Sequence, residues 1–219
     1  MIFAKIDYIN LLPLHIYMKK YPLPSGIKKA MAYKSGVPSK MNKALAKRLI
    51  DASMISSIES FKKKYKTLDV GICANKKVLS VLVCKNTSYE KDSSSATSNA
   101  LAKILRQEGR VLIGDKALKA YLENKELYID LCELWYEKTG LPFVFGRFSC
   151  LKHKDFYERM LKNFLKAKIK IPNYILEKYE EQRGICKKDI KEYLELIYYK
   201  IGVKEKRALK KFQSLLKTI

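Results

Sequence analysis

Two apolar, strand-like segments on either side of a long middle block constrain the fold of this chain more than any other feature. The first is Val78–Cys84, VLSVLVC, and the second is Leu141–Gly146, LPFVFG. Short apolar runs of this kind are typical of buried strands. We expect the chain to cross between two lobes at both places, near Val81–Lys85 and again within the second segment.

A two-lobed division of the chain follows from these crossings. We expect a discontinuous first lobe of residues 1–84 plus 146–219, and a second lobe of residues 85–145. The last third is expected to be helical, because its apolar residues recur at helical spacing and core packing explains them. The three stripes are Phe156, Met160, Leu161, Phe164 and Leu165, then Ile190, Tyr193, Leu194, Ile197 and Ile201, then Leu209, Phe212, Leu215, Leu216 and Ile219.

Strand-like and helix-like segments alternate in the first third of the chain. This alternation favours an α/β fold with a mostly parallel sheet. The expected strands are Ile2–Ile6, Lys29–Tyr33 and Asp51–Ser56; the expected helices are Leu11–Lys19 and one from Ser39 with Met41, Leu45 and Leu49 on one face.

The chain is strongly basic, with 45 Lys and Arg against 22 Asp and Glu and a net charge of +23. Charge alone is a weak indicator of a partner, and these lysines are spread along the whole chain. A basic nucleic-acid-binding protein is therefore the less favoured interpretation. A small anionic substrate fits equally well, and it predicts a positive cleft between the lobes.

The five cysteines form no CxxC pair, which indicates free thiols in a reducing compartment. With two histidines in the chain we expect no His-rich metal site, and we expect no cofactor. The N-terminus lacks the basic start and apolar stretch of a signal peptide. The longest uncharged run, Tyr8–Met18, has 11 residues, too few to span a membrane. We expect a cytoplasmic protein without a membrane partner.

Hydroxyl side chains crowd the segment Ser93–Ser98, where five of six residues carry one. The apolar residues that follow predict a helix, so the cluster lies at its positive N-terminal end. Such an end suits a carboxylate or phosphate, although one hydroxyl would suffice as a cap. We expect Ser95 to be the cap, and Thr97 and Ser98 to contact an anion.

Further polar residues follow other predicted strands, where open α/β sheets bind ligands. Asn10 lies at a strand-to-helix turn, Ser56 at a strand end, and Ser80 inside the apolar strand. Gly114 and Asp115 end the strand RVLIGD. Two plain structural roles remain open: Ser80 as a buried hydroxyl bonded to backbone, and Asp115 as a helix cap.

The order of these motifs carries a resemblance. YINLLPL, GVPS, ISSIE, VLSVLV, SSSATS, LIGDKAL and LWYEKTGLPFVFG together resemble the chorismate dehydratases of the menaquinone pathway that runs through futalosine. The match covers roughly Ile2 to Phe148, and its most specific part is Asp130–Phe145. The resemblance implies a two-lobed, type II periplasmic-binding-protein-like fold with a cleft between the lobes and a helical C-terminal part. It also implies a cytoplasmic enzyme.

The resemblance further implies a reaction and the residues that serve it. Chorismate would be the small-molecule substrate, dehydrated to 3-[(1-carboxyvinyl)oxy]benzoate without metal or cofactor. Asn10 and Ser80 would be active-site residues, and the substrate's own enolpyruvyl carboxylate would remove the proton. The residues expected to bind substrate are Ser56, Ser95, Thr97, Ser98, Gly114 and Asp115. A small-anion-binding protein of the same fold, without catalysis, is the alternative.

Overall fold

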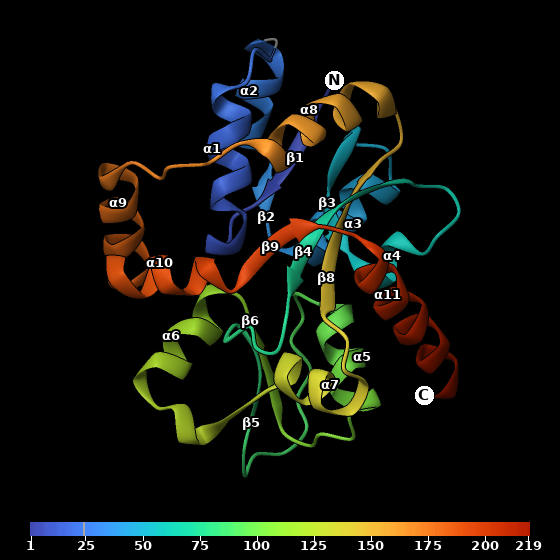
Figure 1. Ribbon diagram of the computed structural model, residues 1–219, viewed down its shortest axis with the longest axis vertical. Coiled ribbons are helices and arrows are strands. Elements are labelled where there is room, and N and C mark those ends of the chain that lie inside the picture. Colours follow the sequence, from blue (N-terminus) through green and yellow to red (C-terminus); the bar gives the residue numbers. More distant parts are fainter. Residues whose placement is uncertain (24) are drawn as a thin grey trace.

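The computed structural model describes residues 1–23 and 25–219, and its strands form a larger and a smaller sheet (Figure 1). Within these residues the larger sheet has six strands in the order β2 (Ser35–Gly36), β1 (Phe3–Ile6), β3 (Ala52–Ser56), β8 (Phe143–Cys150), β4 (Lys66–Ala74) and β9 (Ile197–Lys200). The smaller sheet has the order β6 (Arg110–Ile113), β5 (Val81–Cys84) and β7 (Tyr128–Asp130).

The prediction of a mostly parallel sheet is wrong. Strand β1 pairs in parallel with β2 and β3, as the alternation in the first third predicts. Strand β8, however, is antiparallel to both β3 and β4, and β4 is antiparallel to β9. Both pairings of the smaller sheet are antiparallel too. Strand β8 is antiparallel to its neighbours because the chain returns from the smaller sheet and inserts β8 between β3 and β4 of the larger one.

The first third otherwise has the expected elements, with two corrections. Helix α1 (Leu12–Lys20) follows the short 3-10 helix η1 (Ile9–Leu11), and α3 (Pro38–Ala46) precedes β3. The strand predicted at Lys29–Tyr33 lies instead in helix α2 (Ser25–Tyr33), a segment rich in Lys and Ala, which favour helices. Leu49 lies beyond the end of α3 and is 58% exposed, so its assignment to the buried face was wrong.

The C-terminal third is helical except for one strand. Its helices are α8 (Lys154–Lys166), α9 (Asn173–Arg183), α10 (Lys187–Glu195) and α11 (Val203–Leu215), with η3 (Leu216–Thr218) last. The helical stripe predicted from Ile190 to Ile201 is interrupted, because β9 extends along β4 after α10 ends. The sequence Ile-Tyr-Tyr in β9 is β-branched and aromatic, a composition that favours strands.

The chain passes from the larger to the smaller sheet between Ala74 and Val81, and returns between α7 (Leu131–Thr139) and β8. The first passage therefore lies earlier in the sequence than the predicted Val81–Lys85. Strand β5 is also shorter than the predicted Val78–Cys84 and begins after Ser80. The division into lobes at residues 84 and 146 stays a prediction, since buried apolar residues form a cluster that spans both sheets.

Helices α4 (Ser57–Ser60), α5 (Ala96–Ile104), α6 (Asp115–Glu123) and α7, with η2 (Lys125–Leu127), complete the fold. Trp135 of α7 is fully buried and packs edge-on against Phe143 of β8 and Phe212 of α11. Its indole N–H donates to the Pro142 carbonyl over 3.1 Å, which ties α7 to the start of β8. No helix in the described ranges is long and apolar enough to cross a bilayer. The five cysteines are free thiols, as expected.

Candidate active site

One pocket lies between the two sheets and draws its walls from both. Six of the predicted site residues line it: Asn10, Ser56, Ser80, Ser95, Ser98 and Gly114. Most of the remaining wall is apolar, contributed by side chains such as Ile55, Ile72 and Phe145. The cavity is small, about 50 Å³, which is room for a few water molecules. Apolar walls with a few converging polar groups are typical of a site for a small organic ligand, and any ligand larger than a few waters requires these walls to move apart.

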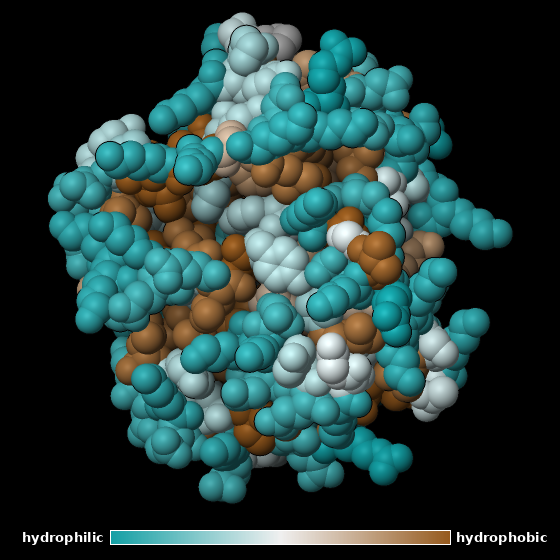
Figure 2. Space-filling view, in the orientation of Figure 1, coloured by the Kyte–Doolittle hydropathy of each residue, from teal (hydrophilic) through white to brown (hydrophobic). Residues whose placement is uncertain are grey.

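The pocket walls formed by the described residues are uncharged. No Asp, Glu, Lys, Arg or His among the described residues lines it, so the positive potential expected in the cleft stays a prediction and would have to come from charges beyond these walls. Figure 2 shows hydrophilic side chains spread over the visible face rather than gathered on one side. The one titratable side chain on the described walls is Tyr8, and burial, reinforced by the Asp92 carboxylate, raises its pKa to about 12. A ligand here meets neutral hydrogen-bonding groups.

Asn10 reaches the pocket from η1, directly after β1. It is 8% exposed, and its side-chain Oδ1 has no hydrogen-bonding partner among the described residues. Its backbone carbonyl accepts a hydrogen bond from the hydroxyl of Tyr199 over 2.7 Å. The main chain is thus fixed while the side-chain amide keeps a free acceptor, and a buried acceptor without a partner indicates a place for a ligand's donor.

Ser80 lies just before β5, with its hydroxyl fully enclosed. Its Oγ is 2.8 Å from the hydroxyl of Tyr193, so the partner is a side chain and not the backbone acceptor considered above. The two preceding residues donate their amide N–H groups to the Asp130 carboxylate over 2.8 and 2.7 Å. The Ser80 carbonyl accepts from the Gly114 N–H over 2.9 Å. These contacts hold the turn that presents Ser80.

Ser56 occupies the end of β3, as predicted, and has a partner that the sequence analysis missed. The side-chain amide of Asn42 donates to Ser56 Oγ over 2.7 Å, and the Ser56 amide N–H donates back to Asn42 Oδ1 over 3.1 Å. Because Ser56 Oγ accepts from Asn42, its own O–H is left to donate toward the pocket.

The hydroxyl cluster divides into a pocket-lining part and a packing part. Ser95 is the N-cap of α5: its Oγ accepts from the Ser98 N–H over 3.2 Å and lies 3.0 Å from Ser98 Oγ. The predicted cap is therefore confirmed. Thr97 is fully buried away from the described pocket wall, and its Oγ1 accepts from the Ile58 N–H over 3.2 Å. Of the two residues predicted to contact an anion, Ser98 is the one at the wall.

Gly114 lines the pocket directly after the end of β6. Its φ is +71°, and a Cβ at this position would lie 2.7 Å from ring atoms of Tyr8. Glycine is thus needed both for the backbone conformation and for the approach of the tyrosine ring. Tyr8, which follows β1, was not among the predicted site residues, although it adjoins Asn10 in the motif YINLLPL.

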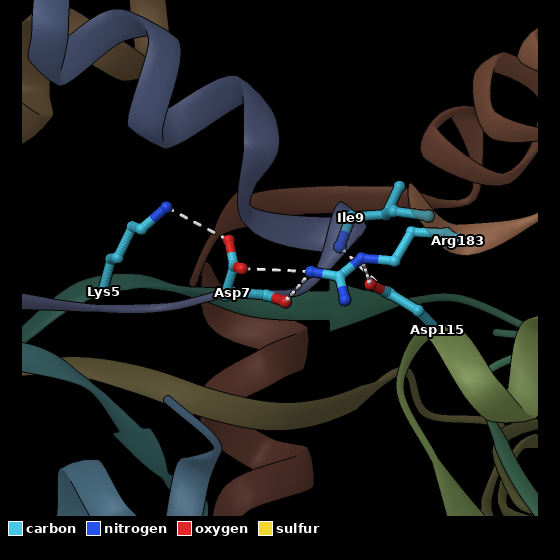
Figure 3. A network of polar contacts seen from close by, with 5 residues as sticks. All are labelled: Lys5, Asp7, Ile9, Asp115 and Arg183. Carbon is cyan, nitrogen blue, oxygen red and sulfur yellow. Dashed lines mark hydrogen bonds and ion pairs between the residues drawn. The ribbon is translucent and has the colours of Figure 1, made fainter. Parts of the chain in front are cut away.

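Asp115 lies behind the pocket, in a polar network shown in Figure 3. Its Oδ1 accepts from the Ile9 N–H over 3.0 Å, and its Oδ2 lies 3.1 Å from Arg183 Nε. Arg183 also pairs with Asp7 over 3.0 Å. Burial raises the pKa of Asp115 to about 6, although the Ile9 amide and Arg183 oppose the rise. Asp115 therefore supports the segment that carries Asn10; whether it also contacts a ligand stays a prediction.

Comparison with known proteins identifies the family. The sequence model of a family described as menaquinone biosynthesis matches residues 1–110 and 105–218. A chorismate dehydratase of Campylobacter jejuni is 66% identical over 220 aligned residues, covering 100% of this chain and 99% of that protein. The chain belongs to the menaquinone biosynthesis family.

Solved structures show which fold this member of the menaquinone biosynthesis family has. A protein of Archaeoglobus fulgidus superposes with a TM-score of 0.69 at 14% identity, covering 99% of this chain and 97% of that one. A Candida albicans gene product, which exhibits the generic periplasmic binding protein fold, has a TM-score of 0.51 at 12% identity, with coverages of 99% and 92%. The periplasmic-binding-protein-like α/β fold, with two sheets and a helical C-terminal part, is therefore confirmed for this chain.

Proposed function

We propose that this protein is a chorismate dehydratase, a hydro-lyase of the cytoplasm that converts chorismate to 3-[(1-carboxyvinyl)oxy]benzoate and water. The observation that carries the proposal is the convergence of Asn10 and Ser80 on one pocket. It occurs in a chain that is 66% identical, over its full length, to a relative named chorismate dehydratase.

The reaction asks for specific groups in the site. Chorismate loses a ring proton beside the enolpyruvyl ether together with the neighbouring hydroxyl, and the ring becomes aromatic. Removal of that proton shifts negative charge through the ring diene onto the ring carboxylate. The site must therefore hold two carboxylates, stabilise the growing charge on one of them, and exclude water.

Neutral donors on the walls suit these tasks. The hydroxyls of Ser56, Ser80 and Ser98 can each donate to a carboxylate oxygen, and the pocket faces the N-terminal end of α5 through Ser95 and Ser98. We assign Ser80 to the carboxylate on which charge grows. An aimed donor in a site that excludes water stabilises such charge far more than it would in solution.

The removal of the proton falls to the substrate in this proposal. The described walls hold no carboxylate or imidazole, and Tyr8, whose pKa is raised to about 12, stays neutral at physiological pH. The enolpyruvyl carboxylate of chorismate is adjacent to the ring proton and can accept it. Asn10 would then orient the ring hydroxyl that leaves, because its free Oδ1 can accept that group's hydrogen.

The proposal is tested by incubating the purified protein with chorismate and following the product by absorbance and mass. We expect chorismate to disappear with the formation of an aromatic dicarboxylate lighter by one water. Calorimetric titration with chorismate runs in parallel. Tight binding without any product would instead support a non-catalytic anion-binding protein. If the protein neither bound chorismate nor formed product, the proposal would be contradicted.

A further inference from the structure

Tyr193 of α10 stands directly behind Ser80. The ring is 2% exposed, and helical spacing alone assigns it to the core of the C-terminal helices. Its hydroxyl nevertheless ends 2.8 Å from Ser80 Oγ, across 113 positions of sequence. Buried tyrosine hydroxyls usually have a hydrogen-bonding partner, and here that partner is a side chain on the wall of the candidate active site.

We propose that Tyr193 is a positioning residue, whose phenol donates to Ser80 Oγ and so turns the Ser80 hydroxyl proton toward the substrate carboxylate. The inference rests on the proposed function. Tyr193 is not on the described pocket wall itself and would act through Ser80. A serine Oγ can accept one hydrogen bond while it donates another, so the two bonds are compatible.

The direction of the hydrogen bond follows from what each group can do. If Ser80 donated to Tyr193, it would turn only lone pairs toward an anionic ligand, and the two would repel each other. With Tyr193 as the donor, Ser80 keeps its own proton for the ligand. Burial raises the pKa of Tyr193 far above its usual value, although Ser80 and Asn10 beside the hydroxyl oppose the rise, so the phenol keeps its proton.

The helix that carries Tyr193 is well placed for this role. In Figure 1, α10 and β9 lie beside the junction of the two sheets. Helix α10 contacts η1, the segment of Asn10, and Tyr199 of β9 donates to the Asn10 carbonyl over 2.7 Å. The C-terminal part of the chain thus supports both predicted catalytic residues from behind, one tyrosine hydroxyl to each.

The test is a double-mutant cycle between Tyr193→Phe and Ser80→Ala. Tyr193→Phe removes only the hydroxyl, and we expect it to lower kcat about tenfold or more with little change in KM. In the Ser80→Ala background the same substitution should have no further effect, because Tyr193 acts through Ser80. The affinity of wild type and of each variant for the product, 3-[(1-carboxyvinyl)oxy]benzoate, is measured as well, because this measurement needs no turnover.

Tyr157→Phe is the matched control. Tyr157 is likewise fully buried, but its hydroxyl has no hydrogen-bonding partner among the described residues and lies away from the pocket. Its removal should leave kcat and affinity unchanged. Replacing Tyr193 with a difluorinated tyrosine keeps the hydroxyl and strengthens its donation, so activity should be retained even if Tyr193→Phe folds poorly.

Three results would overturn the inference. Normal kcat and product affinity in Tyr193→Phe would show that the hydroxyl is dispensable. If Tyr193→Phe caused an equal loss of kcat or product affinity with and without the Ser80 hydroxyl, Tyr193 would act by another route. Wild-type protein that does not dehydrate chorismate would contradict the proposed function, and the Tyr193 role with it. Turnover by wild type together with an additive cycle would contradict the Tyr193 role alone.

Discussion

Arg183 Nε lies 3.1 Å from Asp115 Oδ2, joining the last residue of α9 to the first residue of α6. The same guanidinium reaches the carboxylate of Asp7, just after β1, over 3.0 Å. Since α6 follows the smaller sheet and Asp7 follows a strand of the larger one, a C-terminal arginine links both sheets. The Asp115 carboxylate also holds the Ile9 N–H, one residue before Asn10.

The first prediction concerns how the contribution of Asp115 to stability depends on pH. Its pKa is raised from 3.8 to about 6 in the folded protein, so the folded state binds this proton more tightly than the unfolded chain does. The contribution of Asp115 to the free energy of unfolding therefore falls as the pH rises through this range. Asp115→Asn keeps an acceptor for Ile9 without a charge. The free energy of unfolding of the variant, relative to that of wild type, should rise by up to roughly 3 kcal/mol as the pH increases from about 4 to about 7.

Urea unfolding of both proteins at the two pH values measures this difference. Arg183→Gln should move the pH window upward, because it removes a cation that opposes the rise in the pKa of Asp115. Lys188→Gln is the control, since Lys188 is 82% exposed and pairs only with Glu192 among the described residues. A difference between Asp115→Asn and wild type that does not change with pH would mean that the carboxylate titrates normally.

The second prediction concerns Asn10 and Ser80. Ser80→Ala should lower kcat about a hundredfold or more, since one aimed donor to developing charge typically contributes about 3 kcal/mol to the transition state. Asn10→Ala should also lose most turnover, because it removes the acceptor that orients the leaving hydroxyl. Both side chains line the pocket, and neither caps a helix. Circular dichroism and the melting temperature should stay close to wild type. A variant that turns over chorismate normally would remove its residue from the mechanism.

The third prediction concerns backbone strain and crowding at Gly114. Gly114 and Gly140 have similar φ values, +71° and +64°, but only Gly114 faces a nearby ring, that of Tyr8. Gly140→Ala should cost about 1 kcal/mol of stability and leave activity intact. Gly114→Ala carries a larger strain, because the ψ of Gly114 is −153°, a region that only glycine adopts readily, whereas Gly140 is left-handed helical with a ψ of 13°. Gly114→Ala must also displace Tyr8 from the pocket wall, so it should abolish most turnover. Equal activity in the two variants would contradict a role for the Tyr8 contact.

Local chemistry allowed much of the site to be predicted. Ser95 is the cap of α5 because a hydroxyl directly before an apolar helical stripe has few other roles. Asn10 and Ser56 stand out because each is a polar residue at the end of an apolar segment, and Ser80 because it is the one hydroxyl inside an apolar strand. Their catalytic and binding roles were implied by the family resemblance. These features depend on neighbours within a few positions, and the sequence displays them directly.

The parts that were missed depend on contacts between distant segments. Nothing local distinguishes Tyr193 from its apolar neighbours, since its partner lies 113 positions away. Strand β9 has strand-forming residues, but only the free edge of β4 makes it a strand rather than the end of a helix. The antiparallel insertion of β8 likewise follows from the return of the chain between the sheets, which no periodicity records.

The last prediction divides the hydroxyl cluster between binding and stability. Ser98 lines the pocket, and the N-cap bond runs from its backbone N–H to Ser95 Oγ, so Ser98→Ala removes a wall hydroxyl and leaves the cap in place. Its affinity for the product should fall about tenfold with little change in melting temperature. Thr97→Val keeps the shape but leaves the partly buried Ile58 N–H without its acceptor, at a cost of about 1 kcal/mol in stability. Product affinity should survive in this variant. Calorimetric titration and thermal unfolding of both variants would show the two effects, and the reverse pattern would place Thr97 rather than Ser98 at the ligand.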